Sequence, residues 1–243
     1  MFLKMIKKII KYALSKKNLE IRRKYNGFCL NDNISWIINK NVKTILDIGA
    51  NDGQFALFAR KMFSDSVIFS FEPLLTCFTK VLEISNNDKN MVALNFALGE
   101  NNETVEMFHD KFSPSSSLLK MTNEHIQNFP YTGNQIKELV KLRKLDTLDE
   151  VKDVEREVLM KIDVQGYELN VLKGATNFIN QYLPLIVLEI SFADLYENEP
   201  AFEEIYDFMR ALDYRFTGTL DQLYSPDDGA ILQADVIFEK NNR

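Results

Sequence analysis

The stretch TILDIGANDGQF, residues 44–55, constrains the fold more than any other part of this chain. A short apolar run ends at Asp47, and Gly49 and Gly53 follow it before a segment with helical spacing. This order predicts a strand, a tight turn and a helix, with backbone N–H groups of the turn close to a bound group. The turn alone does not indicate which cofactor it holds, if any.

The rest of the chain after Asn41 alternates short apolar runs with amphipathic segments, which is typical of βαβ units and a mostly parallel sheet. The predicted strands are 44–48, 67–71, 91–96, 158–164, 185–191, 214–217 and 235–239, and the predicted helices are 54–63, 75–85, 167–180 and 201–212. Between 103 and 146 the alternation stops. We therefore expect one domain over 41–243 with an insertion near 103–146, which has a short strand at each end and a helix near Asn123.

The N-terminal segment has a different charge from the rest. Residues 1–25 hold nine lysines and arginines and one acid, Glu20, whereas the whole chain has a net charge of -6. Phe2, Ile6 and Ile9 share one helical stripe, so residues 1–40 are predicted to be a basic amphipathic helical extension. The favoured interpretation is packing on the main domain, and peripheral contact of residues 1–25 with an anionic membrane is the alternative. Nucleic acid is not expected as a partner, because the acidic remainder repels phosphate.

The sequence predicts a cytoplasmic location, with peripheral association at the inner face of the membrane as an open alternative. It has no run of about 18 apolar residues and no secretory signal. Its two cysteines, Cys29 and Cys77, follow no metal or redox spacing, which fits a reducing compartment. Nothing in the sequence indicates an oligomeric state.

The glycine spacing of the turn argues against phosphate-containing cofactors. A dinucleotide fingerprint needs a second glycine where Asn51 stands, and no Gly-Lys-Ser/Thr follows as in a phosphate loop. A cofactor with a ribose and a polar tail but no phosphate remains, and S-adenosylmethionine is such a cofactor.

The end of the second predicted strand provides a carboxylate for a ribose. Glu72, followed by Pro73, stands where it can accept hydrogen bonds from both ribose hydroxyls. Nicotinamide enzymes use the same arrangement, so Glu72 supports a ribosyl cofactor without choosing between the two, while Asp47 favours the methyl donor with its ammonium group. The alternative is structural, an acid that caps the next helix.

Four motifs in order resemble those of the FkbM family of methyltransferases. They are DIGANDGQF at 47–55, FEP at 71–73, NFALG at 95–99 and KIDVQGYE at 161–168, followed by LKGA at 172–175. The resemblance covers roughly residues 40–240. It implies an α/β, Rossmann-like class I fold that depends on S-adenosylmethionine. Its seven-stranded, mostly parallel sheet has an antiparallel last strand and helices on both faces. It also implies O-methylation, frequently of sugar hydroxyls. The most frequent family residue at Gln165 is glutamate, so this chain departs from the pattern there.

The expected cofactor contacts follow these motifs. They are Asp47, Gly49, Ala50, Asn51, Gly53, Phe55, Glu72, Pro73, Asn95, Ala97 and Asp163.

Transfer of a methyl group from a sulfonium requires an acceptor oxygen held in line and a base for its proton. Asp163, at the end of the fourth predicted strand, is the favoured base; its structural alternative is to cap the next turn and orient Lys161. Glu168 and His109 are the other catalytic candidates. A divalent metal is compatible with this chemistry but not favoured, since the sequence shows no closed ligand set, and no metal-binding residue is predicted.

The sequence thus predicts an S-adenosylmethionine-dependent O-methyltransferase that acts on a hydroxyl of a sugar or glycan, in a surface polysaccharide, glycolipid or glycosylated natural product. Two alternatives stay open. One is a catalytically inactive cofactor-binding module that partners a glycan-synthesis enzyme, for which Gln165 leaves room. The other, disfavoured by the glycine spacing, is a nicotinamide oxidoreductase.

Overall fold

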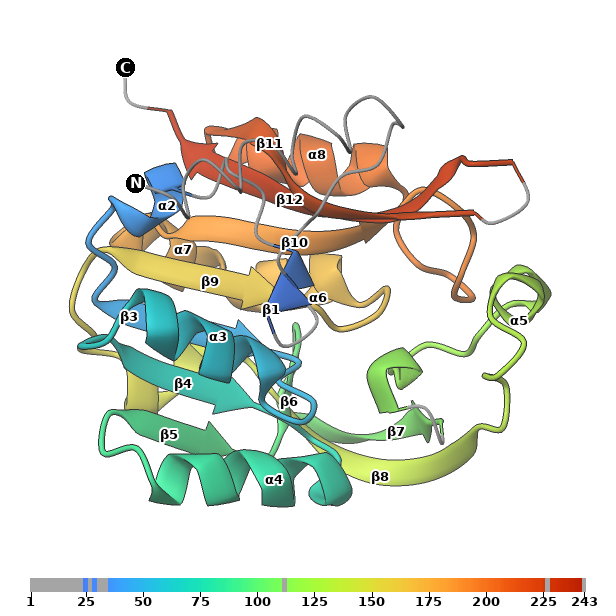
Figure 1. Cartoon of the computed structure of the whole chain (residues 1–243), viewed down its shortest axis with the longest axis horizontal. Coiled ribbons are helices and arrows are strands. Elements are labelled where there is room, and N and C mark those ends of the chain that lie inside the picture. The colour runs from blue at the N-terminus through green and yellow to red at the C-terminus, as the bar shows by residue number, and fades with distance from the viewer. Residues whose placement is uncertain (1–23, 26–27, 30–34, 111–112, 226–227, 242–243) are drawn as a thin grey trace, which may run out of the picture.

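A seven-stranded sheet forms the centre of the computed structural model, which describes residues 24–25, 28–29, 35–110, 113–225 and 228–241 (Figure 1). Its strands lie in the order β11 (Tyr214–Tyr224), β12 (Ile231–Lys240), β10 (Leu185–Ser191), β9 (Val158–Ile162), β3 (Thr44–Ile48), β4 (Val67–Phe71) and β5 (Met91–Leu94). β12 is antiparallel to both of its neighbours, and the pairs from β10 to β5 are parallel. The predicted sheet with one antiparallel strand is confirmed.

Helices cover both faces of the sheet. α2 (Ser35–Ile38), α3 (Gln54–Met62) and α4 (Leu75–Asn86) lie on one face, and α6 (Glu168–Gly174), α7 (Thr176–Tyr182) and α8 (Phe202–Ala211) lie on the other. Ile45 and Leu159 face the first core, whereas the next residues along the same strands, Leu46 and Met160, face the second. Because both faces are buried, the central strands read as continuous apolar runs. This confirms the Rossmann-like α/β class.

The single helix predicted over 167–180 is wrong. The structure has two helices, α6 and α7, with Ala175 between them. Gly174 ends α6 against the backbone of Gly99, where an added Cβ would lie 1.9 Å from the carbonyl oxygen. The close approach of these two backbones fixes the end of the helix, and it joins residues that are far apart in the sequence.

The last two strands are longer than predicted. β11 continues to Tyr224, and β12 begins at Ile231, so the two form a long hairpin. Their extra residues are largely polar or exposed, because β11 is an edge strand and its pairing is interrupted by irregularities beside Gly218. Apolar alternation therefore does not mark them.

The region predicted as an insertion forms an arm beyond the carboxyl ends of the central strands (Figure 1). Its three-stranded sheet has the order β6 (Ala97–Leu98), β8 (Ile136–Arg143) and β7 (Glu103–His109), and its helical segments are α5 (Asn123–Asn128) and η2 (Ser113–Ser115). The short helices η3 (Leu145–Thr147) and η4 (Asp149–Val151) follow the arm and pack on the second core through Leu145 and Val151. Met107 and Val140 of this arm pack on Leu74 and Cys77 beside α4. These contacts attach the arm at the carboxyl edge of the seven-stranded sheet, where the sequence motifs lie.

Little of the N-terminal extension can be described. β1 (Lys24–Tyr25) and β2 (Phe28–Cys29) form a two-stranded antiparallel pair. Within the helical extension predicted over 1–40, residues 24–25 and 28–29 are strands rather than helix, since they pair with each other. Residues 1–23 lie outside the described residues, so the membrane contact of this segment stays a prediction. Within the described part of the chain, no helix has the length and apolarity needed to cross a bilayer.

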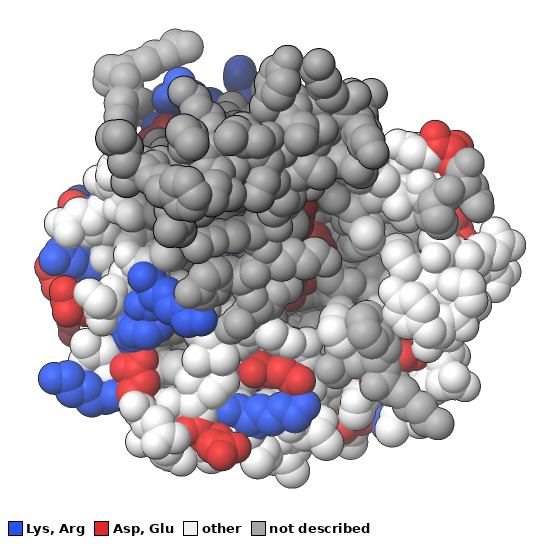
Figure 2. All heavy atoms as spheres, in the orientation of Figure 1, with Lys and Arg blue, Asp and Glu red and all other residues white. Residues whose placement is uncertain are grey.

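The surface over α3 and α4 carries charges of both signs. Figure 2 shows acidic and basic side chains next to each other on the described part of this face. Arg60 pairs with Asp88 at 2.6 Å, and Lys80 pairs with Asp52 at 2.7 Å. The first pair is half-buried and joins α3 to the residues after α4. The second joins α4 to the turn before α3 at the surface, where such a pair is worth at most about 1 kcal/mol.

Candidate functional site

The turn after β3 is bound to the end of β4. The backbone N–H groups of Gly49 and Ala50 both donate to the carbonyl of Phe71, at 3.1 and 3.0 Å. Gly49, Asn51 and Gly53 all have positive φ, at 81°, 47° and 81°. A Cβ on Gly49 would lie 1.9 Å from the carbonyl oxygen of Asp163. Glycine is thus required at this position by the close contact with Asp163, directly after β9, as well as by its positive φ angle.

Glu72 lies buried at the end of β4, with 4% of its surface exposed. Its two carboxylate oxygens accept hydrogen bonds from the backbone N–H groups of Asn51, at 2.8 Å, and Leu74, at 2.9 Å. Burial raises the pKa of Glu72 to about 8, and these two hydrogen bonds oppose that rise. The same side chain therefore holds the glycine turn and the start of the next segment in place.

A narrow pocket brings several predicted cofactor residues together. Gly49, Glu72, Pro73 and Ala97 line it, with apolar walls from Leu98, Met107, Leu118, Val164 and Tyr167. Asn95 supports one side, since its amide donates to the backbone carbonyls of Glu72, at 2.9 Å, and Pro73, at 3.0 Å. The arm contributes Met107 and Leu118, so it closes the pocket against the carboxyl edge of the sheet.

Asp47 and Phe55 lie together beside a buried lysine. Lys161 of β9 has 3% of its surface exposed, is paired in register with Asp47, and has its ammonium 5.5 Å from the centre of the Phe55 ring. The Oδ2 atom of Asp47 accepts a 3.3 Å hydrogen bond from Ser70, and its Oδ1 has no partner among the described residues. Burial raises the pKa of Asp47 to about 6, although Lys161 lowers it.

Asp163 follows β9 directly, and both of its carboxylate oxygens have partners. Lys161 donates to Oδ2 at 2.7 Å, and Gln165 donates to Oδ1 at 2.8 Å. Burial alone would raise the pKa of Asp163, but Lys161 and the hydrogen bonds outweigh it and hold that pKa below its usual value. Asp163 is therefore a stable anion, which accords with the predicted alternative in which it orients Lys161.

Glu168 lies beneath the turn that follows β9. Its Oε1 accepts hydrogen bonds from the backbone N–H groups of Val164, at 3.0 Å, and Gly166, at 3.2 Å, and only 2% of the residue is exposed. Burial raises the pKa of Glu168 to about 8. The contacts support the turn, and a direct catalytic role for Glu168 stays a prediction.

The structure does not join His109 to the other catalytic candidates. Its ring lies 3.4 Å from the carboxylate of Glu138 across the β7–β8 pair. No hydrogen bond or ion pair connects it to Asp163 or Glu168 in the part of the chain that the structure describes. Any contribution of His109 to catalysis remains a prediction about the acceptor side.

A network that the sequence did not predict surrounds Gln165. Its amide nitrogen donates to Glu189 of β10 as well as to Asp163, and its amide oxygen accepts a 2.8 Å hydrogen bond from the Tyr196 phenol. Gln233 of β12 donates to the same Glu189 oxygen at 3.1 Å. Asp235, also of β12, lies opposite Glu189. The sequence feature that could have indicated this network is that polar residues stand at alternate positions of otherwise apolar strands.

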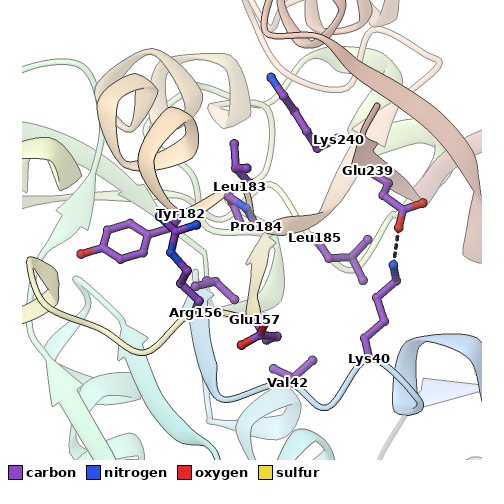
Figure 3. A pocket seen from close by; sticks show the side chains of 11 residues that line it. Lys40, Val42, Arg156, Glu157, Tyr182, Leu183, Pro184, Leu185, Glu239 and Lys240 are labelled. Carbon is purple, nitrogen blue, oxygen red and sulfur yellow. Dashed lines mark hydrogen bonds and ion pairs between the residues drawn. The ribbon is translucent and has the colours of Figure 1, made fainter. Parts of the chain in front are cut away.

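A second hollow, of about 360 Å³, lies at the opposite edge of the sheet (Figure 3). The starts of β9 and β10 and the end of β12 line it, and Lys40 pairs with Glu239 at its rim. None of the predicted site residues is among its lining residues. Within the described ranges, no group of three or more His, Cys, Asp or Glu side chains is arranged to hold a metal ion.

A family model described as the methyltransferase FkbM domain matches residues 47–216. The chain belongs to the FkbM methyltransferase family. The match begins at Asp47 and includes all the motifs that build the carboxyl edge of the sheet. The family membership implied by the sequence is therefore confirmed.

Three curated relatives are similar over part of their length. Methyltransferase 1 of Beauveria bassiana is 28% identical over 160 residues, which are 60% of this chain and 64% of that protein. Hexuronic acid methyltransferase AglP of Haloferax volcanii is 27% identical over 147 residues, 59% of this chain and 54% of that protein. 2-O-methyltransferase NoeI of Sinorhizobium fredii is 23% identical over 210 residues, 79% of this chain and 86% of that protein. The chain thus spans less than two thirds of the first two.

A solved structure supports the fold. The FkbM methyltransferase from Methylobacillus flagellatus superposes with a TM-score of 0.51 at 15% identity, and the match covers 82% of this chain and 43% of that one.

We expect Gly49→Ala to lower the free energy of unfolding by at least about 3 kcal/mol, since the new methyl group meets a backbone carbonyl that cannot move away. Gly229→Ala is the matched control, because Gly229 has a similar φ of 76° but open space around it. It should cost about 1–2 kcal/mol from the φ angle alone. Urea unfolding of both variants checks this, and equal losses would contradict the contact.

Glu168→Gln should make the pH dependence of stability shallower. The folded protein keeps the Glu168 proton to a higher pH than the unfolded chain does, so stability falls as pH rises from about 4.5 to about 8. Glutamine retains the acceptor oxygen and removes this slope, which is up to about 1.4 kcal/mol per pH unit. Urea unfolding between pH 5 and 8 measures it. The exposed Glu83→Gln should leave the slope unchanged, and an unchanged slope for Glu168→Gln would contradict the interpretation.

Proposed function

We propose that this chain transfers a methyl group from S-adenosylmethionine to a hydroxyl of a sugar or glycan. The observation that carries the cofactor assignment is the charge at the carboxyl edge of the sheet. Three carboxyl groups, those of Asp47, Asp163 and Asp235, lie near one buried cation, Lys161. Such an excess attracts the sulfonium and ammonium groups of S-adenosylmethionine and repels the pyrophosphate of a dinucleotide.

Different residues of the site suit different parts of the cofactor. Glu72 lies in the pocket and can accept the ribose hydroxyls, while the turn at Gly49 lets backbone approach closely. The apolar walls that include Leu98, Met107 and Leu118 suit a flat nucleobase. Asp47, with its unpartnered Oδ1, suits the ammonium of the methionine part.

The acceptor class rests on the relatives. The name of AglP specifies a hexuronic acid, and that of NoeI specifies methylation at a 2-oxygen. Together they favour a sugar hydroxyl for this chain. The arm formed by β7, β8 and α5 borders the same edge of the sheet and offers the acceptor side, where His109 is a candidate contact.

The chemistry requires little from the protein. S-adenosylmethionine supplies a methyl group that its sulfonium already activates. The protein has to hold an oxygen in line with that methyl group, exclude water and accept one proton. The buried carboxyl groups after β9 and within β10 are suited to the last task.

Titration calorimetry with S-adenosylmethionine tests the cofactor assignment. We expect Glu72→Ala to weaken binding by about 10- to 100-fold, because the ribose loses a hydrogen-bond acceptor and the turn loses its support. NAD should not bind. The control is Glu83→Ala, an exposed carboxylate on α4, which should bind like the wild type. Thermal melts of each variant separate a lost contact from a lost fold.

Failure of the folded wild type to bind S-adenosylmethionine would overturn the proposal, and binding of NAD alone would revive an oxidoreductase. If the cofactor binds, labelled S-adenosylmethionine and a panel of hexoses and hexuronic acids test the acceptor. Transfer to a protein or amine and to none of the sugars would contradict the sugar hydroxyl. Binding without transfer to any acceptor would favour the inactive module.

A further inference from the structure

A row of ionisable side chains crosses four neighbouring strands on the α3 face of the sheet. Asp47 and Lys161 are register partners in β3 and β9, and Glu189 and Asp235 are register partners in β10 and β12. All four point to the same face, since each stands two residues from a member of the core beneath α3, respectively Ile45, Leu159, Val187 and Ile237. Two carboxyl groups directly opposite each other, as at Glu189 and Asp235, repel when both are ionised.

The only lysine in this row is already committed to Asp163. Its ammonium donates to that carboxylate at 2.7 Å, and Gln165 occupies the other oxygen. Asp163 is therefore the fixed anion of the group, because a proton on it would have to replace its ion pair with Lys161.

Glu189 has the opposite environment. A single one of its oxygens, Oε2, accepts hydrogen bonds from the two amides of Gln165 and Gln233. The Gln165 amide nitrogen donates to Asp163 as well, so one nitrogen joins the two carboxyl groups and holds them close together. Two carboxyl groups this close repel strongly when both are ionised, and Lys161 keeps Asp163 ionised. The proton therefore belongs to Glu189, which remains partly exposed.

We propose that Glu189 holds a proton in the donor-free protein, releases it when the positive sulfonium of S-adenosylmethionine binds, and so becomes the base that deprotonates the acceptor hydroxyl. This inference rests on the proposed function. Before the donor binds, the proton on Glu189 limits the negative charge of Glu189 and Asp163. After it binds, the positive sulfonium at the edge of the row compensates that charge instead.

Charges and groups from every neighbouring element bear on Glu189. Burial and the negative charges of Asp163, Asp235 and Glu168 raise its pKa well above the usual value, and Lys161 lowers it. The Tyr196 phenol is linked to it through Gln165, whose amide oxygen accepts from Tyr196 and whose amide nitrogen donates to Glu189. Because most of these charges are negative, the sulfonium of a bound donor should lower the pKa of Glu189.

The step balances. The acceptor oxygen forms a bond to the methyl carbon, the bond from that carbon to sulfur breaks, and its electron pair stays on sulfur. The hydroxyl proton passes to the Glu189 carboxylate. The sulfur is then neutral and Glu189 is protonated, so the charge of the row returns to its donor-free value.

The test is calorimetric and needs no acceptor. S-adenosylmethionine and S-adenosylhomocysteine differ in the charge on sulfur, so the difference between their proton release isolates the effect of that charge. Titrations at pH 7 in two buffers of different ionisation enthalpy should show about one more proton released by S-adenosylmethionine in the wild type. Glu189→Gln should abolish the difference while both ligands still bind.

Glu83→Gln is the control, since Glu83 is an exposed carboxylate on α4, outside the row. It should leave the difference in place. A difference that persists in Glu189→Gln, or equal proton release by both ligands in the wild type, would overturn the inference. If neither ligand binds, the proposed function itself fails, which is a distinguishable result.

A second measurement serves if Glu189→Gln does not fold. In the wild type, the affinity for S-adenosylmethionine divided by that for S-adenosylhomocysteine should rise with pH. The rise is up to about tenfold per pH unit over the range in which Glu189 is protonated without the donor and ionised with it. A ratio that is constant between pH 6 and 9 would overturn the proposal.

Discussion

Lys161 lies in the middle of the sheet with 3% of its surface exposed, and a buried ammonium is tolerated only where anions surround it. The anions come from three other places: Asp47 on β3, Asp163 after β9 and Asp235 on β12. Their positions depend on strand order and register, since β9 lies between β3 and β10. The same pairing that satisfies the lysine thus collects the carboxyl groups from which the proposed cofactor site is built.

Much of this arrangement could be predicted because it is local in sequence. Strands of a parallel sheet end at one edge, so the motifs after 44–48, 67–71 and 158–162 had to meet there. The contact of Gly49 with Asp163 explains why the first motif has a glycine at that point. The family match over 47–216 rests on these same segments.

The parts that could not be predicted depend on contacts between distant residues. The break between α6 and α7 is fixed by the approach of Gly174 to Gly99, and neither local sequence shows it. Glu189 is a carboxylate in an otherwise apolar strand, and its pairing with Asp235 follows only from β12 lying next to β10. Gln165 looked like a departure from the family pattern. In the structure its amide donates to two carboxyl groups, where a glutamate would add a third.

The antiparallel position of β12 also affects how the site forms during synthesis. β12 leaves the ribosome after all the other strands of the sheet, yet it is inserted between β10 and β11. Until it arrives, β10 is an edge strand, and Glu189 faces water without Asp235 or Gln233 beside it. A nascent chain can therefore complete the glycine turn and the Glu72 contacts early, whereas the electrostatic environment of Glu189 exists only after the C-terminal hairpin has closed.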